Sequence, residues 1–167
     1  MNTWMDILKN NNFIAAKQYI KNGANINEEG EGGESVLVHA IRHRCDEELL
    51  QLLLENGADI FNFDDEGVSI FDIAITYDNL FMFNHIIEAG INVNQTKRKS
   101  GFTPLMCAAC YGRAEITTIL LEHGADKNCT DLRGFSALDF ARKMNKKSVL
   151  KILGFDKELP QNRGYAK

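Results

Sequence analysis

Two sets of glycines recur along the chain at one spacing, and this periodicity constrains the fold more than any other feature. The first set is spaced by 34, 34 and 33 residues: Gly33, Gly67, Gly101 and Gly134. The second set is spaced by 34, 33 and 34 residues: Gly23, Gly57, Gly90 and Gly124. A related five-residue phrase follows each glycine of the second set, as in Gly124-Ala-Asp-Lys-Asn128. A fixed period of this length indicates a protein built by stacking copies of one structural unit.

The stretch 101–128 shows the unit most clearly. Thr103 is suited to cap a helix N-terminus, and Pro104 then occupies the one helical position where a missing N–H costs no hydrogen bond. Apolar residues follow at helical spacing as far as Gly112, and a second amphipathic run ends at Gly124. The sequence therefore predicts two short helices that cannot bury their apolar faces within one unit, so neighbouring copies must pack together.

Gly101-Phe-Thr-Pro-Leu-Met-Cys-Ala-Ala109 resembles the Gly-x-Thr-Pro-Leu-His-x-Ala-Ala phrase of ankyrin-repeat proteins. In that family each unit is a β-turn finger followed by two antiparallel helices. The resemblance therefore implies an all-α fold, an ankyrin-repeat solenoid of stacked helix-turn-helix units with β-turn fingers. No copy keeps the family's His, and its position is held by Val38, Asp72, Met106 and Asp139. This departure bears on the usual hydrogen bonding of that His between repeats, but not on the fold.

The resemblance covers nearly the whole chain and implies one ankyrin-repeat domain over residues 1–154. Its five repeats are predicted at about 1–30, 31–64, 65–98, 99–131 and 132–154. The first and last repeats are capping repeats, because each has a neighbour on one side only. Residues 155–167 show no periodicity and are predicted to be a C-terminal tail.

The formal net charge of −4 argues against a general nucleic-acid binder, which would carry a basic stripe. Apolar runs are too short to span a bilayer, so no membrane association is expected. The N-terminal residues lack the basic and apolar regions of a secretory signal. A cytoplasmic location is expected, or a periplasmic or secreted one if a signal peptide has been removed.

Four irregularly spaced cysteines are read as structural: Cys45, Cys107, Cys110 and Cys129. Cys107 and Cys110 have the spacing of a redox or metal pair, but no second Cys or His pair accompanies them. The sequence also lacks a phosphate-binding glycine loop, a nucleophile elbow and a Ser/His/Asp set. We therefore expect no metal, no cofactor and no enzymatic activity.

In the family that this sequence resembles, residues flanking the first-set glycine and residues at the end of the first helix line a concave binding surface. Carrying those positions over gives the predicted partner-binding residues: Asp65, Glu66, Val68, Tyr77, Lys99, Phe102, Cys110, Tyr111, Arg133, Phe135 and Met144. Aromatic and methionine enrichment with a charged rim is typical of a protein-binding patch. The alternative is that Phe102 and Phe135 fold back onto neighbouring fingers and serve the fold alone.

The sequence thus predicts a monomeric, non-catalytic module that binds one protein partner, whose identity it does not reveal. A second hypothesis is an immunity-type or inhibitor protein that occludes an enzyme's active site, as some bacterial ankyrin proteins do. A weaker third hypothesis is a haem-handling accessory of a catalase, with Cys110, Tyr111 and His123 as ligands.

Overall fold

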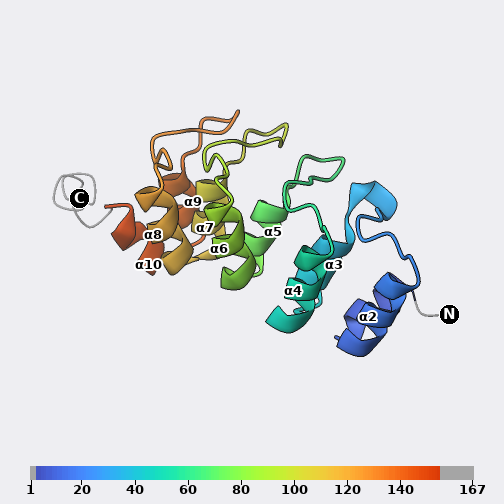
Figure 1. Ribbon diagram of the computed structural model, residues 1–167. Helices are drawn as coiled ribbons and strands as arrows, with labels where there is room; N and C mark the ends of the chain where they lie inside the picture. The colour runs from blue at the N-terminus through green and yellow to red at the C-terminus, as the bar shows by residue number, and fades with distance from the viewer. Residues whose placement is uncertain (1–2, 155–167) are drawn as a thin grey trace, which may run out of the picture. The chain divides into compact units, whose positions relative to one another are not determined.

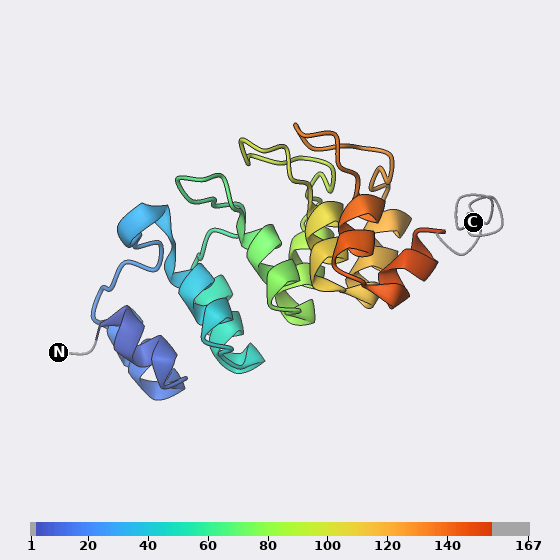
Figure 2. The same cartoon turned by 180° about the vertical axis from the view of Figure 1, so that it is seen from behind.

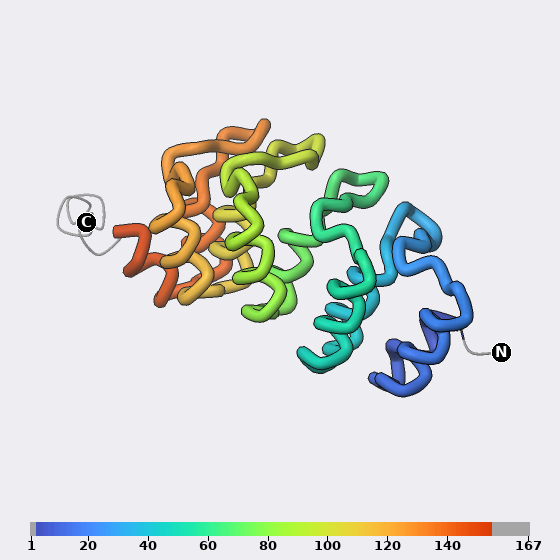
Figure 3. The backbone as a smooth tube through the Cα atoms, in the orientation of Figure 1, coloured from blue at the N-terminus to red at the C-terminus, as the bar shows by residue number. Residues whose placement is uncertain are grey.

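The computed structural model describes residues 3–154, and the predicted tail over 155–167 lies outside this range. The chain divides into two compact units, residues 1–90 and residues 91–167. Over residues 3–154 the structure has ten α-helices, one 3-10 helix and no β-strand (Figures 1 and 3). The predicted all-α fold is confirmed, while the repeat boundaries and their assignment to one domain stay predictions.

The first unit contains three helix pairs and a short 3-10 helix, η1 (Glu31–Gly33). The pairs are α1 (Trp4–Lys9) with α2 (Phe13–Lys21), α3 (Val36–Arg42) with α4 (Glu47–Glu55), and α5 (Ile70–Thr76) with α6 (Leu80–Glu88). Helix α3 packs between α1 and α5, and α2 packs against α4. The long connections between pairs project from one end of the helices (Figure 1).

The second unit contains two helix pairs, which Figure 2 shows from behind. They are α7 (Pro104–Tyr111) with α8 (Ala114–Glu122), and α9 (Ala137–Lys143) with α10 (Lys147–Ile152). Helix α7 packs closely against α9 through small, buried side chains that include Ala108, Ala109 and Ala141. Helix α8 packs against α10, so each helix of one pair has a counterpart in the next.

The first helix of every pair begins at a hydroxyl residue, Thr3 for α1 and then Ser35, Ser69, Thr103 and Ser136. Each hydroxyl oxygen accepts from the backbone N–H three residues on, which satisfies a donor at the helix start. In three of these helices the residue that stands where the family has His completes the cap, because its side chain accepts from the backbone N–H of the hydroxyl residue. Asp72 Oδ2 accepts from the Ser69 N–H at 3.0 Å, Asp139 Oδ2 from the Ser136 N–H at 2.8 Å, and Met106 Sδ from the Thr103 N–H at 3.4 Å.

The core of the first unit combines aliphatic side chains with buried aromatic rings. The rings of Phe71 and Phe83, both fully buried, stack with their centroids 5.1 Å apart. At the N-terminal end Trp4 is buried, and its indole N–H donates to the Asn25 carbonyl at 2.9 Å. The first helix pair therefore belongs to the packed structure.

Asparagine side chains join consecutive turns within each unit. Asn27 donates its amide to the Gly57 carbonyl at 3.0 Å and accepts from the Asp59 N–H at 2.8 Å. Asn94 repeats the arrangement with the Gly124 carbonyl at 2.9 Å and the Asp126 N–H at 2.8 Å. Both asparagines end the phrase that follows a second-set glycine, so these bonds recur with the sequence period.

Candidate protein-binding surface

The eleven predicted partner-binding residues divide between the two units. Four belong to the first unit: Asp65, Glu66, Val68 and Tyr77. Seven belong to the second: Lys99, Phe102, Cys110, Tyr111, Arg133, Phe135 and Met144. Within each unit the loops between helix pairs and the ends of the first helices position these side chains.

In the first unit, three of the residues lie on the loop between α4 and α5. Asp64 builds this loop, because its Oδ1 accepts from the N–H groups of Glu66 and Val68, both at 2.9 Å. The N–H of Asp65 donates to the Gly32 carbonyl of the preceding loop at 3.0 Å. Asp65 and Glu66 are exposed and Val68 is half-buried. The result is an acidic loop tip without an exposed aromatic ring at the position after the glycine.

Tyr77 lies away from that loop tip. It follows α5 as its C-cap, so it stands at the opposite end of the helix from Val68. Its half-buried ring lies under the guanidinium of Arg44, whose central carbon is 5.9 Å from the ring centroid. The two residues contribute to a groove of about 440 Å³ together with residues of the turns between helices. The structure therefore does not bring Tyr77 together with Asp65 and Glu66.

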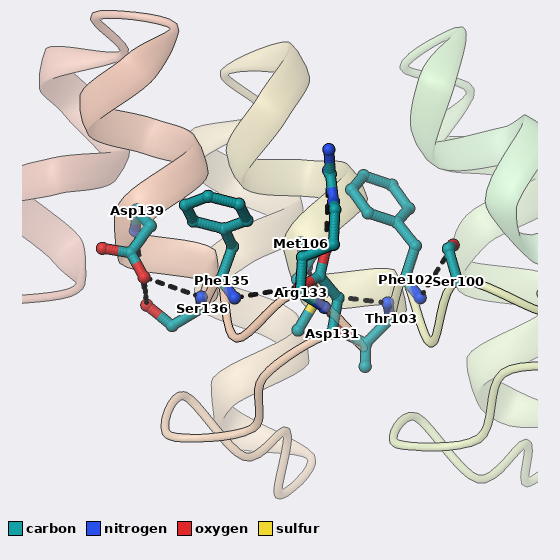
Figure 4. Close-up of polar contacts among 9 residues, drawn as sticks. All are labelled: Ser100, Phe102, Thr103, Met106, Asp131, Arg133, Phe135, Ser136 and Asp139. Carbon is teal, nitrogen blue, oxygen red and sulfur yellow. Dashed lines mark hydrogen bonds and ion pairs between the residues drawn. The ribbon is translucent and has the colours of Figure 1, made fainter.

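In the second unit, Asp131 builds the loop that carries Arg133 and Phe135 (Figure 4). Its side chain is 1% exposed, and its Oδ1 accepts from the N–H of Phe135 at 2.9 Å and of Arg133 at 3.0 Å. The Phe135 hydrogen bond is the largest influence holding the pKa of Asp131 below its ordinary value. Burial opposes this effect, while the N–H and the charge of Arg133 add to it.

The preceding loop of this unit is built differently, because Arg98 takes the position held by Asp64 and Asp131. Thr96 supplies the acceptor instead: its Oγ1 accepts from the Arg98 N–H at 3.1 Å and donates to the Phe102 carbonyl at 2.7 Å. The loop that carries Lys99 and Phe102 therefore has a basic side chain where the two other loops have an aspartate.

The rings of Phe102 and Phe135 both meet Phe140 of α9. Phe140 contacts Phe102 edge-on, with centroids 5.1 Å apart, and Phe135 at 6.1 Å. The central carbon of the Arg98 guanidinium lies 4.9 Å from the Phe102 centroid, and that of Arg133 lies 5.3 Å from the Phe135 centroid. Figure 4 shows Phe102, Arg133 and Phe135 projecting to the same side of their loops. We name these five residues the aromatic cluster.

Sequence reasoning did not single out Phe140 or Arg98, although a signal for each was present. Phe140 stands six residues after a first-set glycine, where the other copies have His39, Ile73 and Cys107. Arg98 stands three residues before such a glycine, where two other copies have aspartate. Arg98 thus stands where two other repeats have aspartate, and Phe140 is the one phenylalanine at its position, so comparing equivalent positions of the repeats would have found both.

A pocket of about 270 Å³ adjoins the aromatic cluster. Its lining combines loop and helix residues: Arg133, Phe135, Asp139, Phe140, Arg142 and Lys143. Phe135 is 43% exposed beside it, so the ring is only partly folded back onto its neighbours. The pocket therefore offers apolar ring surface next to basic side chains.

Three of the remaining predicted residues, Cys110, Tyr111 and Met144, lie at the C-terminal ends of two packed helices. Tyr111 ends α7 and Met144 caps α9, and both occupy the tenth position after a first-set glycine. They are 46% and 47% exposed, respectively. Cys110 is half-buried beside Tyr111, and Lys99 is exposed on its loop. The second unit thus presents two groups of apolar side chains, one on its loops and one at its helix ends.

The four cysteines are free thiols in the structure. Cys45 is buried and donates its S–H to the Leu8 carbonyl at 3.2 Å, and burial raises the pKa of its thiol to about 11. Cys107 is buried in α7, whereas Cys110 and Cys129 are half-buried. Over residues 3–154 no group of three or more His, Cys, Asp or Glu side chains could hold a metal ion.

The three residues considered as haem ligands do not converge. Cys110 and Tyr111 end α7, while His123 caps the end of α8, and its Nδ1 lies 2.8 Å from the Ile119 carbonyl. Because the two helices are antiparallel and joined by a short turn, their C-terminal ends lie at opposite ends of the pair. In the part of the chain that the structure describes, no helix is long and apolar enough to cross a membrane.

A family model described as ankyrin repeats (3 copies) matches residues 4–97 and 73–162 of this chain. Among curated proteins, the E3 ubiquitin-protein ligase Ufd4 of Drosophila melanogaster is 35% identical over 106 residues, which are 64% of this chain and 4% of that protein. The E3 ubiquitin-protein ligase hecd-1 of Caenorhabditis elegans is 32% identical over 116 residues, 68% of this chain and 4% of that protein.

The nuclear factor NF-kappa-B p105 subunit of Gallus gallus is 34% identical over 146 residues, which are 82% of this chain and 14% of that protein. The chain therefore spans only a small part of these relatives, and the ligase activity in two of the names belongs to those proteins. Ankyrin repeats generally act as protein-interaction modules. With the family match over most of its length and its capped helix pairs at a period of 33 to 34 residues, this chain belongs to the ankyrin-repeat family.

Proposed function

We propose that this chain is a non-catalytic protein-interaction module whose partner contacts the second unit. The observation that carries the proposal is that four large apolar side chains of that unit are exposed on two packed helices, α7 and α9, and on the loop that leads into α9. They are exposed by between 43% and 80%: Tyr111, Leu132, Phe135 and Met144. Among the described residues, the first unit exposes as many, but they are spread over α1, α2 and the loop between α4 and α5. Exposed apolar side chains rimmed by polar residues mark interaction sites, and aromatic residues contribute most of the binding energy in such sites.

The scaffold around these side chains supports the proposal. The loop that presents Phe135 is held by backbone hydrogen bonds to the buried Asp131, and the ring also rests on Phe140. A side chain held in this way loses little conformational entropy when a partner binds, so more of its contact energy appears as affinity. Tyr111 and Met144 are likewise carried on helices that pack against each other.

The test is affinity capture with the full chain from an extract of the source cells, followed by titration of the captured protein. Replacing Tyr111 and Phe135 by Ala should weaken binding by about tenfold or more, because truncated interface aromatics commonly cost that much. The matched control is Ile14→Ala, which removes an apolar side chain that is 80% exposed on α2 of the first unit. The control should bind as the unaltered chain does.

Thermal unfolding of the same variants separates binding from stability. The double variant should keep its melting temperature within a few degrees, since surface changes usually alter stability by less than about 0.5 kcal/mol. Unchanged binding by the double variant, or equal loss in Ile14→Ala, would contradict the proposed surface.

A further inference from the structure

The two units carry opposite charge. Residues 1–90 contain 16 acidic and 5 basic side chains, a formal charge of −11, whereas residues 91–167 contain 7 acidic and 14 basic side chains, a formal charge of +7. The overall charge of −4 conceals this division. The second unit is therefore a segment of net positive charge within a protein that is acidic as a whole.

Three basic side chains of the second unit line the pocket beside the aromatic cluster. They are Arg133, Arg142 and Lys143, and the exposed Lys99 lies on the neighbouring loop. Asp139 is the one acidic residue of the lining, and its Oδ2 accepts from the N–H and the hydroxyl of Ser136. This carboxylate is therefore engaged in capping α9, and cations outnumber anions around the pocket.

The contact between Arg133 and Asp131 is too long to be a charge-assisted hydrogen bond. Arg133 Nη2 lies 3.6 Å from Asp131 Oδ2, and Arg142 Nη1 lies 3.9 Å from Asp139 Oδ1. Charge-assisted hydrogen bonds between such groups are about 2.7–2.9 Å long. A guanidinium has five N–H donors, so the contact with Asp131 leaves Arg133 with donors for the carboxylates of a ligand.

The geometry points to an acidic polypeptide segment as the ligand of this surface, with one apolar side chain seated in the pocket against Phe135 and Phe140. This inference rests on the proposed function and names the chemistry of its partner. The pocket volume of about 270 Å³ suits a single side chain, because it lies at the lower limit of roughly 300–1,000 Å³ for small-molecule sites. Flanking Asp or Glu residues of the segment pair with Arg133, Arg142 and Lys143.

A single-stranded nucleic acid also combines negative charge with apolar ring faces, but the geometry of this surface favours an acidic polypeptide. Such ligands stack their bases on open aromatic faces. Here the ring of Phe102 meets Phe140 at an interplanar angle of 86°, and guanidinium groups lie over the rings of Phe102 and Phe135. The aromatic cluster thus presents ring edges and a pocket, which suit an inserted side chain better than a stacked base.

The experiment is selection of random peptides of about a dozen residues displayed on phage, with the full chain as bait at low ionic strength. Selected peptides should be rich in Asp and Glu and carry an apolar residue such as Leu or Phe. Their affinity, measured by fluorescence anisotropy, should fall about tenfold in Lys143→Glu and in Arg133→Glu, because each change reverses one charge at the pocket. It should also fall as salt rises from roughly 0.05 M to 0.3 M.

The matched control is Lys17→Glu, which reverses an exposed lysine on α2 of the first unit and should leave affinity within about twofold. Selected peptides without an excess of acid that still depend on Tyr111 and Phe135 would overturn the acidic-segment inference and leave the proposed surface standing. Acidic peptides that bind Tyr111→Ala and Phe135→Ala as tightly as the unaltered chain would overturn the surface itself.

Two further outcomes count against the inference. Recovery of no acidic peptide from the library would overturn it. Binding of oligothymidine at least as tight as that of the best acidic peptide, and equally weakened by Lys143→Glu, would assign the surface to nucleic acid.

Discussion

The loops 64–68 and 131–135 share one backbone design and differ in what they display. In each, an aspartate three residues before a glycine accepts from the N–H groups two and four residues ahead, at 2.9 to 3.0 Å. The first loop presents Glu66 and the half-buried Val68, whereas the second presents Arg133 and the 43% exposed Phe135. The comparison teaches that main-chain hydrogen bonds set the shape of the loop, while its side chains set the surface chemistry independently.

The same contrast continues in the helix behind each loop. Ile73 of α5 is 6% exposed and belongs to the core of the first unit. Phe140 of α9 stands at the equivalent position but is half-buried, and it supports the rings of Phe102 and Phe135. The same position of the repeat therefore serves stability at Ile73 and the candidate binding surface at Phe140.

The largest expected effect comes from shortening these two equivalent side chains. Ile73→Ala should lower the free energy of unfolding by about 3 kcal/mol, because it leaves a cavity in the core. Phe140→Ala should lower it by about 1–2 kcal/mol, because part of the ring is already exposed. Urea unfolding of the full chain measures both values. An equal loss in the two variants would show that Phe140 is a core residue like Ile73, and would contradict the different roles assigned to the two positions.

A smaller effect is expected from the asparagines that join consecutive turns. Asn27→Ala and Asn94→Ala should each lower the free energy of unfolding by about 1 kcal/mol, since each removes two hydrogen bonds at exposed positions. The effect should be equal in the two units because the geometry is equal. Asn128→Ala, an exposed asparagine at the same position of the last phrase, is the control and should change stability by less than about 0.5 kcal/mol. Unequal losses for Asn27 and Asn94 would mean that the backbone design is not shared.

The smallest expected effect is on the pH dependence of stability. The pKa of Asp131 is lowered chiefly by the Phe135 N–H, and the pKa of Asp46 chiefly by the Leu49 N–H. A lowered pKa in the folded state adds stability that is present above roughly pH 4 and is lost as the pH falls through the folded pKa.

Asp131→Asn and Asp46→Asn keep a side-chain oxygen acceptor but do not titrate. In each variant the melting temperature should therefore fall less steeply between about pH 6 and pH 3 than in the unaltered chain. Differential scanning calorimetry at a series of pH values measures this. Curves parallel to that of the unaltered chain would show that these carboxylates do not contribute to acid unfolding.

Much of the fold could be predicted from the sequence because its signals are local. Thr103 and Pro104 begin α7, and Gly112 ends it with φ of 70°, as their backbone preferences require. The capping role of Asp72 and Asp139 was open to the same reasoning, since a carboxylate three residues after a hydroxyl cap is a known pairing. Each of these features depends on residues within one turn of each other.

The candidate surface was predictable only in part, because its contacts join residues far apart in the chain. Phe102 and Phe140 are separated by more than one repeat, and no local pattern specifies that their rings meet. Tyr77 was assigned to the same surface as Asp65 because of its position in the repeat. In the structure it lies at the far end of α5 from the loop that carries Asp65. Position in the repeat fixes which element carries a residue, whereas packing between elements decides its neighbours.

Three of the hydrogen bonds that hold the loop around Asp131 are donated by main-chain N–H groups. The N–H groups of Arg133 and Phe135 donate to Asp131, and that of Leu132 donates to the Ser100 carbonyl at 2.9 Å. Every amino acid except proline supplies such a donor. These three positions can therefore change side chain without losing the bonds that hold the loop, and proline is the one residue they exclude. A new binding specificity could arise here by substitution alone, with no compensating change in the scaffold.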